Sequence, residues 1–262
     1  MQQTRFAWYL LAPAAILLIV LLVLPIVIMA IYTFYEFVTA GVEKATYTLA
    51  NWQEFFGDSY YHLFLWKTAR VAAITAIACA IMGYIPAYFI WMTSFRHKWL
   101  LLLLLIVPFW ISFTIRTFSW IHILGEQGAI NVTLMSLGII DSPIRMLYTE
   151  GAVIMGMIHF LLPYMILNVY VSLEGIDRDL LSAARTLGCT SAQAFREVTL
   201  PLSLPGLCAG LLLCFVLAAG SYVTPQILGS NRDALFGNLI YDTIMSQLNY
   251  MGLSQIFKGL SR

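Results

Sequence analysis

The chain has 262 residues, of which 61% are apolar and only 10% are Asp, Glu, Lys or Arg. A typical soluble domain is about 45–50% apolar and about 25% charged. This composition excludes a disordered chain or a coiled coil, and so few charges disfavour an ordinary soluble enzyme because they cannot cover a large water-facing surface. The net charge is +1, and no strongly basic stretch indicates a nucleic-acid partner. We therefore predict an all-α polytopic membrane protein.

Gaps between the charged residues mark the predicted membrane spans. A helix that crosses a bilayer needs about 20 mostly apolar residues. The first gap is longer than the apolar core of a signal peptide and is not followed by a small-residue cleavage site, so an uncleaved helix is favoured over a removed signal. The gaps predict five spanning helices, at about residues 7–31, 71–93, 99–122, 151–173 and 203–223.

The placement of the charges also bears on orientation and energy supply. Lys and Arg are packed more densely into the connections on the N-terminal side, which favours a cytoplasmic N-terminus. Asp and Glu all lie outside the predicted spans, whereas ion-driven carriers usually need an intramembrane carboxylate. The sequence has no GxxxxGK(S/T) phosphate-binding loop, no metal-binding cysteine pattern and no catalytic constellation. We therefore predict a chain that is not itself an enzyme and that draws its energy from a partner.

The connection between the fourth and fifth spans, residues 174–201, is predicted to lie in the cytosol as two short helices. Asp177 can cap the first helix, and Gly188 suits the left-handed residue that ends it. Thr190 and Gln193 have the spacing of a capping box that starts the second helix. Pro201 either stops that helix or begins the next span.

Two interpretations of this connection differ in what its apolar side contacts. A helix lying on the bilayer surface would need a basic polar face, but the charges here are of mixed sign. Small residues near Gly188, beside a projecting Phe195, favour docking into a groove of a partner protein. The apolar face of the first short helix is expected to comprise Leu180, Leu181, Ala184 and Leu187.

The same connection resembles the signature loop of the permease subunits of ABC importers. That signature is a Glu-Ala-Ala, a Gly four residues after the last Ala, and a Leu-Pro about a dozen residues after the Gly. This chain has Ser in place of the Glu, which removes a polar contact that the Glu often makes in the family. The matching residues are Ser182, Ala183, Ala184, Gly188, Phe195, Leu200 and Pro201.

The resemblance implies a fold, partners and a mechanism. It implies a type I ABC importer permease in the bacterial cytoplasmic (inner) membrane, with residues 174–201 forming coupling helices that sit in a cleft of an ATPase subunit. Closure of the ATPase dimer on ATP and Mg²⁺ would rock the spans from inward- to outward-facing. Besides lipid, the implied partners are the ATPase dimer, a second permease subunit of the same or another kind, and a soluble solute-binding protein. The permease chain itself would hold no cofactor.

Three further segments resemble the polyamine-type (spermidine/putrescine) permeases, and the resemblance covers about residues 5 to 248. These segments begin at Arg116, Met146 and Ser221. Polyamine permeases often carry an acidic residue before an aromatic-Val-Thr-Pro element, whereas this chain has Ser221 before Tyr222. The resemblance implies import of a polyamine or a related small organic cation. An amino-acid derivative as the solute, or an ion-coupled carrier, are the alternatives.

Candidate residues for a solute path depend on a predicted break of the fifth helix at Pro225, where backbone polar groups can face a cavity. Arg116 would lie about 26 Å along a straight third span, so it is expected to reach the outer headgroups rather than a solute. His159 and Asn168 are expected to form hydrogen bonds between helices. The candidate path residues are Ser221, Tyr222, Thr224 and Tyr164.

Two segments outside the predicted spans, residues 36–69 and residues 232–262, are considered separately. Residues 36–69 are rich in aromatic side chains, which fit either a docking surface for the binding protein or a cap on the membrane. Residues 232–262 form a predicted non-spanning tail, because the charge-free gap at 243–257 is too short and too polar for a span. We expect the family match to fail after about Asn249 and a sixth helix to be missing through truncation or a frameshift, with a five-span variant as the alternative.

Overall fold

A computed structural model describes residues 2–39, 42–93 and 98–247 of the chain. The chain divides into two compact units. One unit is Phe64–Asn238, and the other consists of the described residues on either side of that segment.

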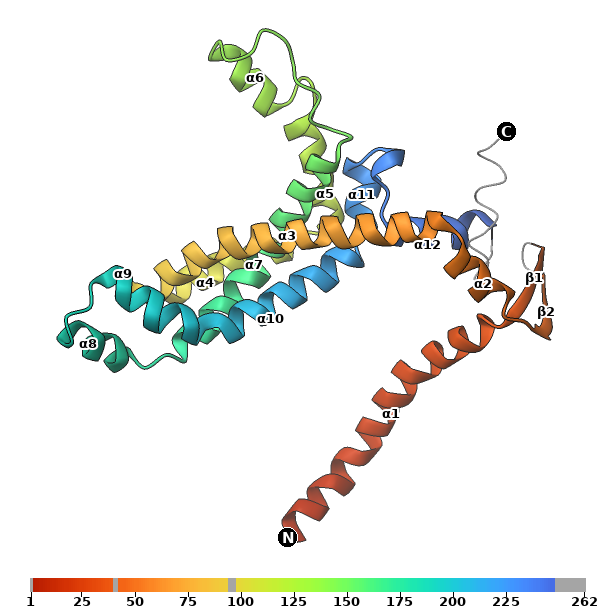
Figure 1. The fold of residues 1–262 in the computed structure, drawn as a ribbon, viewed down its shortest axis with the longest axis horizontal. Helices are drawn as coiled ribbons and strands as arrows, with labels where there is room; N and C mark the ends of the chain where they lie inside the picture. The colour runs from red at the N-terminus through yellow and green to blue at the C-terminus, as the bar shows by residue number, and fades with distance from the viewer. Residues whose placement is uncertain (1, 40–41, 94–97, 248–262) are drawn as a thin grey trace. The chain divides into compact units, whose positions relative to one another are not determined.

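The smaller unit begins with helix α1 (Gln2–Tyr32), drawn in red in Figure 1. Its described side chains from residue 16 to residue 31 are apolar and exposed on every side, which is typical of a helix surrounded by lipid or partner helices. An antiparallel hairpin follows, with strands β1 (Tyr35–Thr39) and β2 (Val42–Tyr47). This hairpin was not predicted from the sequence, which indicated an all-α protein.

Aromatic side chains hold the rest of the smaller unit together. The rings of Tyr35 and Tyr47 lie 5.6 Å apart across the hairpin. Asn51, in helix α2 (Ala50–Gly57), donates hydrogen bonds to the carbonyl oxygens of Thr33 and Tyr35. Tyr61 is fully buried. The predicted external connection is therefore folded and contains a hairpin, a short helix and packed aromatic rings.

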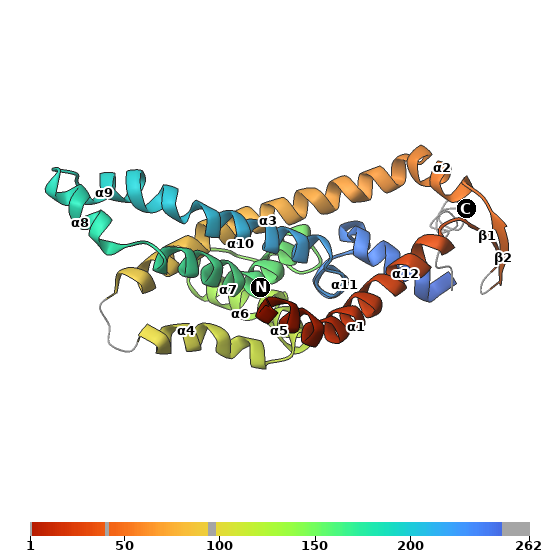
Figure 2. The same ribbon diagram turned by 90° about the horizontal axis from the view of Figure 1, so that it is seen from below.

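Three long helices form the centre of the larger unit: α3 (Ser59–Met92), α7 (Glu150–Glu174) and α10 (Leu200–Ala219). The two ribbon views show them running side by side (Figure 1 and Figure 2). The buried side chains between them are mostly small or flexible, such as Ala76, Cys79, Met165 and Cys214. Such residues let membrane helices approach closely, since packing replaces the hydrophobic effect as the driving force in lipid.

The third predicted span is not one helix. It consists of α4 (Lys98–Ile106), the 3-10 turn η1 (Val107–Trp110) and α5 (Phe113–Leu124), and the chain bends by 89° at the break. Pro108 lacks a backbone N–H and weakens the helix, while Ile111 and Ser112 adopt extended backbone angles. The prediction of a continuous helix at residues 99–122 was therefore wrong. Helix α6 (Ala129–Ser136) follows α5.

Short elements occupy the two ends of the long helices. At one end lie α8 (Arg178–Thr186), α9 (Ser191–Ala194) and the π-helical turn η2 (Phe195–Thr199), which runs directly into α10. At the other end lie α11 (Val223–Leu228) and the 3-10 turn η3 (Asn231–Asp233), and helix α12 (Phe236–Gln247) follows them in the chain. Figure 2 shows α8 and α9 at the opposite end of α7 and α10 from α11.

Three helices in the described part of the chain are long and apolar enough to cross a membrane: Ser59–Met92, Glu150–Glu174 and Ser191–Ala219. They correspond to the second, fourth and fifth predicted spans, and the bent α4–α5 pair is a fourth if it counts as one span. The apolar part of α1, Ile16–Tyr32, is shorter. The end of the predicted tail, and with it the expectation of a missing sixth helix, lies outside the described residues.

Candidate functional site

The α8–α9 loop is shaped by local capping interactions. The Asp177 side chain accepts a hydrogen bond from the Asp179 N–H at 3.0 Å. Gly188 has φ of +89°, and the Cys189 and Gly188 amides donate to the carbonyl oxygens of Ala184 and Arg185. This is the Schellman arrangement, which needs a left-handed residue at its centre. The two caps predicted here, at Asp177 and Gly188, are both confirmed.

The second short helix begins with a complete capping box. The Thr190 hydroxyl accepts from the Gln193 amide at 3.3 Å, and the Gln193 side chain accepts from the Thr190 N–H at 2.8 Å. The chain then passes through η2 into α10 without interruption. Pro201 neither stops the second short helix nor starts a new one, because Ser191–Ala219 forms one continuous helix in which Pro201 lies just after the π-helical turn η2.

Phe195 does not project from the loop as predicted. Its ring packs edge-on against Tyr84 and Tyr88 of α3, with centroids 5.8 and 5.2 Å away. Tyr84 in turn shares a hydrogen bond of 2.8 Å with Ser203 of α10. Phe195 is thus half-buried between helices and fastens the loop to α3, rather than offering itself to a partner.

Polar contacts fix the same end of the unit. The Arg178 guanidinium donates to the Trp91 carbonyl oxygen at 2.7 Å and lies over the indole ring. Lys98, at the start of α4, pairs with Glu174, at the end of α7, at 2.7 Å. Sequence reasoning missed Arg178 as an anchor, because its partner is a backbone carbonyl at the end of another helix. Arg178 therefore attaches the loop to the end of α3, and Lys98 attaches α4 to the end of α7.

The outer side of the loop is partly apolar. Leu187 is 85% exposed and Leu180 is 47% exposed, whereas Ala184 is buried. The predicted apolar face of α8 is thus not a single buried face. The seven signature residues separate accordingly: Ser182, Ala183, Gly188 and Pro201 are exposed, while Ala184, Phe195 and Leu200 are buried or half-buried.

Replacing Phe195 with alanine is expected to lower the thermal unfolding temperature of the detergent-purified protein. A fully buried Phe→Ala change costs about 3–5 kcal/mol, so about 2 kcal/mol is expected for this half-buried ring, or about 4–8 °C. Leu187→Ala, in the same loop but exposed, is the matched control and should leave the temperature unchanged. Equal temperatures for the two variants would contradict the anchoring role of Phe195.

The candidate path residues are not gathered at one point. Helix α10 ends at Ala219 and the chain is non-helical at Ser221 and Tyr222, so the break precedes Pro225, which lies inside α11. Tyr222 is partly exposed. Thr224 is buried, and its hydroxyl has no hydrogen-bond partner among the described residues.

Tyr164, the fourth candidate, lies on α7 in an aromatic group. Its ring is 4.9 Å from that of Phe109 and 5.6 Å from that of Phe160. Asn168 does not bond to another helix as predicted, because its amide donates to the Tyr164 carbonyl one turn earlier. The interhelical bond predicted for His159 is confirmed: Trp120 of α5 donates to its Nδ1 at 3.2 Å.

Arg116 belongs to the same aromatic group. Its guanidinium lies 5.8 Å from the Phe109 ring centroid and 5.7 Å from that of Phe160. The expectation that Arg116 reaches the outer headgroups stays a prediction.

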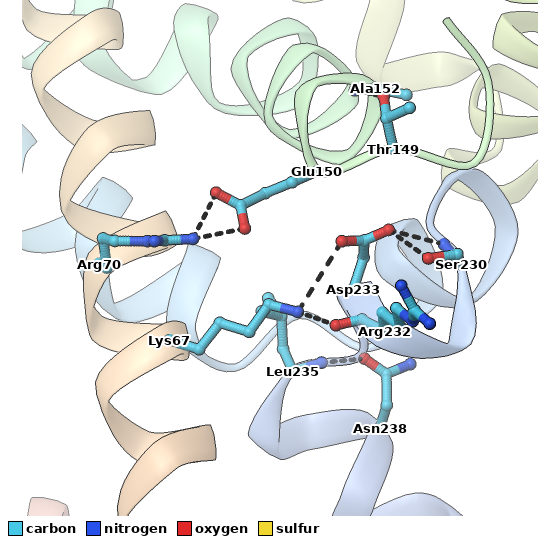
Figure 3. Close-up of polar contacts among 10 residues, drawn as sticks. All are labelled: Lys67, Arg70, Thr149, Glu150, Ala152, Ser230, Arg232, Asp233, Leu235 and Asn238. Atoms are coloured by element: carbon cyan, nitrogen blue, oxygen red, sulfur yellow. Dashed lines mark hydrogen bonds and ion pairs between the residues drawn. The ribbon is translucent and has the colours of Figure 1, made fainter. Parts of the chain in front are cut away.

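Ion pairs hold the other end of the larger unit (Figure 3). Arg70 of α3 pairs with Glu150 at the start of α7 at 2.5 Å. Lys67 of α3 lies 3.8 Å from Asp233 of η3 and donates to the Arg232 carbonyl oxygen. These contacts attach the segment after α11 to α3, so both ends of the helix group are tied by charges from different elements.

The fold itself defines the class of protein. A bacterial ABC transporter that imports the acidic polysaccharide alginate has a similar structure, with a TM-score of 0.75 over 95% of this chain and 87% of that chain, at 15% sequence identity. The same kind of transporter in complex with an alginate-pentasaccharide-bound periplasmic protein gives a TM-score of 0.72 over 95% and 86% of the two chains, at 15% identity. The helix group with a capped loop at one end is thus the permease fold of ABC importers.

Sequence comparison identifies the family. Residues 132–257 match the family described as binding-protein-dependent transport system inner membrane component. The spermidine/putrescine transport system permease protein PotB of Escherichia coli K12 is 37% identical over 201 residues, which are 77% of this chain and 73% of PotB. PotB of Haemophilus influenzae is 36% identical over 82% of this chain and 74% of its own length. The chain belongs to this family of multi-pass inner-membrane permease subunits of ABC importers.

The family match also corrects one expectation. The match was expected to fail after about Asn249, but it continues to residue 257. The polar composition of residues 243–257 therefore does not mark the end of family-like sequence.

Proposed function

We propose that this chain moves a small organic solute inward by ATP-driven alternating access, with the α8–α9 loop as the point where an ATPase dimer acts. The observation that carries the proposal is the loop itself. It is shaped by three local caps, attached to α3 by Phe195 and Arg178, and exposes Leu180 and Leu187 on its outer side. A loop held in this way can transmit a push from a partner to the long helices.

The chain is proposed to act without an ATPase site of its own. ATP and Mg²⁺ would bind in the partner ATPase, and this chain would supply the coupling surface and part of the solute path. A second permease subunit, identical or different, would complete that path. A soluble binding protein would deliver the solute, and the support for this partner is that the similar alginate transporter forms a complex with a solute-bound periplasmic protein.

The proposed orientation places the N-terminus and the α8–α9 loop in the cytosol. The Lys and Arg distribution supports this arrangement. It puts the ion pairs of Lys67 and Arg70 at the outer end of α3.

The proposed solute is a polyamine or a related small organic cation. The support is that PotB of two organisms, both named for spermidine and putrescine transport, are 37% and 36% identical to this chain. The described interiors of α3, α7 and α10 carry no Asp or Glu between their ends, which leaves an ion-coupled carrier without the carboxylate it usually needs.

Uptake by the complete transporter in proteoliposomes tests the proposal. We expect uptake of the solute to require ATP inside and the binding protein outside. The solute would be chosen by thermal stabilisation of the cognate binding protein across polyamines and amino-acid derivatives. Uptake that persists without ATP but stops when the proton gradient is collapsed would indicate an ion-coupled carrier instead.

A further inference from the structure

Helix α2 of the smaller unit has one packed side and one exposed apolar side. Leu49, directly before the helix, and Trp52 and Phe56 within it are three and four positions apart, so they fall on the same side. Leu49 is 59% exposed and Phe56 is 64% exposed. The other side packs within the smaller unit through Asn51 and Phe55. The exposed stripe of Leu49, Trp52 and Phe56 is therefore available for contact with something outside the chain.

Helix α2 is fixed to the end of α1. The Asn51 side-chain amide donates to the carbonyl oxygens of Thr33 and Tyr35 at 3.0 and 2.9 Å. The rings of Phe34 and Trp52 have centroids 6.2 Å apart. The residues contacted are the first three after α1, so α2 lies next to the point where α1 ends (Figure 1).

The end of α1 sets a level relative to the membrane. The segment Ile16–Tyr32 is apolar and exposed. It is about 25 Å long, which is most of the roughly 30 Å of the hydrocarbon layer. The polar residues Thr33 and Glu36 come directly afterwards. With α1 as the first span, Tyr32 lies near the boundary between hydrocarbon and headgroups, and α2 lies at the same level.

The side chains at this level are of the kind that the membrane boundary favours. Tyr and Trp are enriched where hydrocarbon meets headgroups. The exposed rings of Tyr32 and Phe34 continue the apolar surface of α1 towards Trp52, which stacks on Phe56 with centroids 6.0 Å apart. Helix α2 contains no Lys or Arg, so its apolar side chains and not attraction to anionic lipid would hold it at the boundary.

We propose that Leu49, Trp52 and Phe56 form a lipid anchor that inserts into the headgroup boundary of the outer leaflet. Of the two roles open for residues 36–69, the stripe on α2 thus serves the membrane and not the binding protein. The argument for lipid is that the stripe is continuous with the exposed apolar surface of α1 and lies at its end. This inference rests on α1 as a span and on the proposed orientation.

Nitroxide labels on added cysteines test the anchor in the complete transporter, reconstituted in phosphatidylcholine vesicles. Cys189 and Cys208, which are not buried, are first replaced with alanine, and the transporter without an added cysteine gives the blank. Ala50→Cys is the matched control for Phe56→Cys, because Ala50 is also exposed but lies about a third of a turn around the helix. Oxygen concentrates in lipid, whereas a nickel chelate stays in water. We expect severalfold more collisions with oxygen and severalfold fewer with the chelate at Phe56 than at Ala50.

Adding the solute-loaded binding protein distinguishes lipid from a protein partner. We expect the values at Phe56 to be the same with and without it. Chelate access at Phe56 that is lost only when the binding protein is added would identify a docking surface and overturn the lipid anchor. Chelate access as high as at Ala50 in both conditions would overturn it as well. Low values for both reagents would mean that another subunit covers the stripe, which also contradicts the proposal.

Two further labels keep the test decisive. Leu49→Cys repeats the measurement at the other end of the stripe and must agree with Phe56→Cys, so poor folding of one variant does not leave the question open. Leu21→Cys, at a position 64% exposed on α1, should show high oxygen and low chelate access. Chelate access at Leu21 would count against the first span and the proposed membrane arrangement. Lipid contact at Leu21 without lipid contact at Phe56 would overturn the anchor alone.

Discussion

Gly188→Val is expected to lower ATP-dependent uptake about fivefold to thirtyfold while leaving membrane insertion intact. Gly188 has φ of +89° in the turn between α8 and α9. A side chain in the left-handed region costs about 1–2 kcal/mol. A cost of this size lowers the population of the native turn about fivefold to thirtyfold. The residue lies in open space, so the substitution distorts the turn without disturbing the helix group. The measurement is uptake by the complete transporter per amount of inserted protein.

The chain offers a matched control for this prediction. Gly138 also has positive φ, at +68°, and an added Cβ there would also meet nothing within 4 Å. It lies just after α6, far along the chain from the α8–α9 loop. Gly138→Val introduces the same kind of backbone strain and should leave uptake close to that of the unchanged protein. Equal losses in the two variants would mean that strain in general, and not the α8–α9 turn, limits transport.

The conformation of the α8–α9 turn could be predicted because each of its caps involves residues close together in sequence. Asp177 bonds to an amide two residues on, and Thr190 and Gln193 bond to each other. Gly188 closes a turn formed by the five residues before it. Interactions of this range depend on residue type and spacing alone, so no knowledge of the helix packing is needed.

The direction of Phe195 could not be predicted in the same way. A large apolar side chain in a short helical segment can face a partner or its own chain. The choice depends on whether another helix places a suitable surface nearby. Here Tyr84 and Tyr88 of α3, more than a hundred positions earlier in the sequence, provide that surface.

The positions and effects of the two helix breaks were also difficult to predict from the sequence. The break near the fifth span was assigned to Pro225, but a proline is well accommodated in the first turn of a helix, and the chain leaves α10 at Gly220 instead. In the third span, Pro108 is visible in the sequence, but the size of the bend beside it is not. The chain bends by 89° between Lys98–Trp110 and Phe113–Ser136, and the Arg116 guanidinium lies 5.7 Å from the Phe160 ring centroid. A single backbone break thus changes which side chains Arg116 can contact.

Gly206→Ala is expected to be the most destabilising of the conservative substitutions between α7 and α10. A Cβ at Gly206 would stand 2.2 Å from the Cβ of Ser172 and 2.7 Å from the carbonyl oxygen of Asn168. Neither atom can move without shifting α7. Overpacking of this kind costs about 1–3 kcal/mol or more. In lipid, close packing is a main source of helix association, so a fall of several degrees in unfolding temperature and a lower yield of folded protein are expected.

Two other glycines serve as comparison positions for this prediction. At Gly210 the nearest atom to an added Cβ is the Met165 sulfur at 2.7 Å, and a flexible methionine can move aside at less cost. At Gly151, near the start of α7, the nearest atom is 3.7 Å away, which is ordinary contact. There alanine should be neutral or slightly stabilising, because glycine is unfavourable inside a helix. The expected order of unfolding temperatures, from highest to lowest, is Gly151→Ala, then Gly210→Ala, then Gly206→Ala. If Gly206→Ala unfolds no lower than Gly210→Ala, the close backbone contact between α7 and α10 is not what holds these helices together.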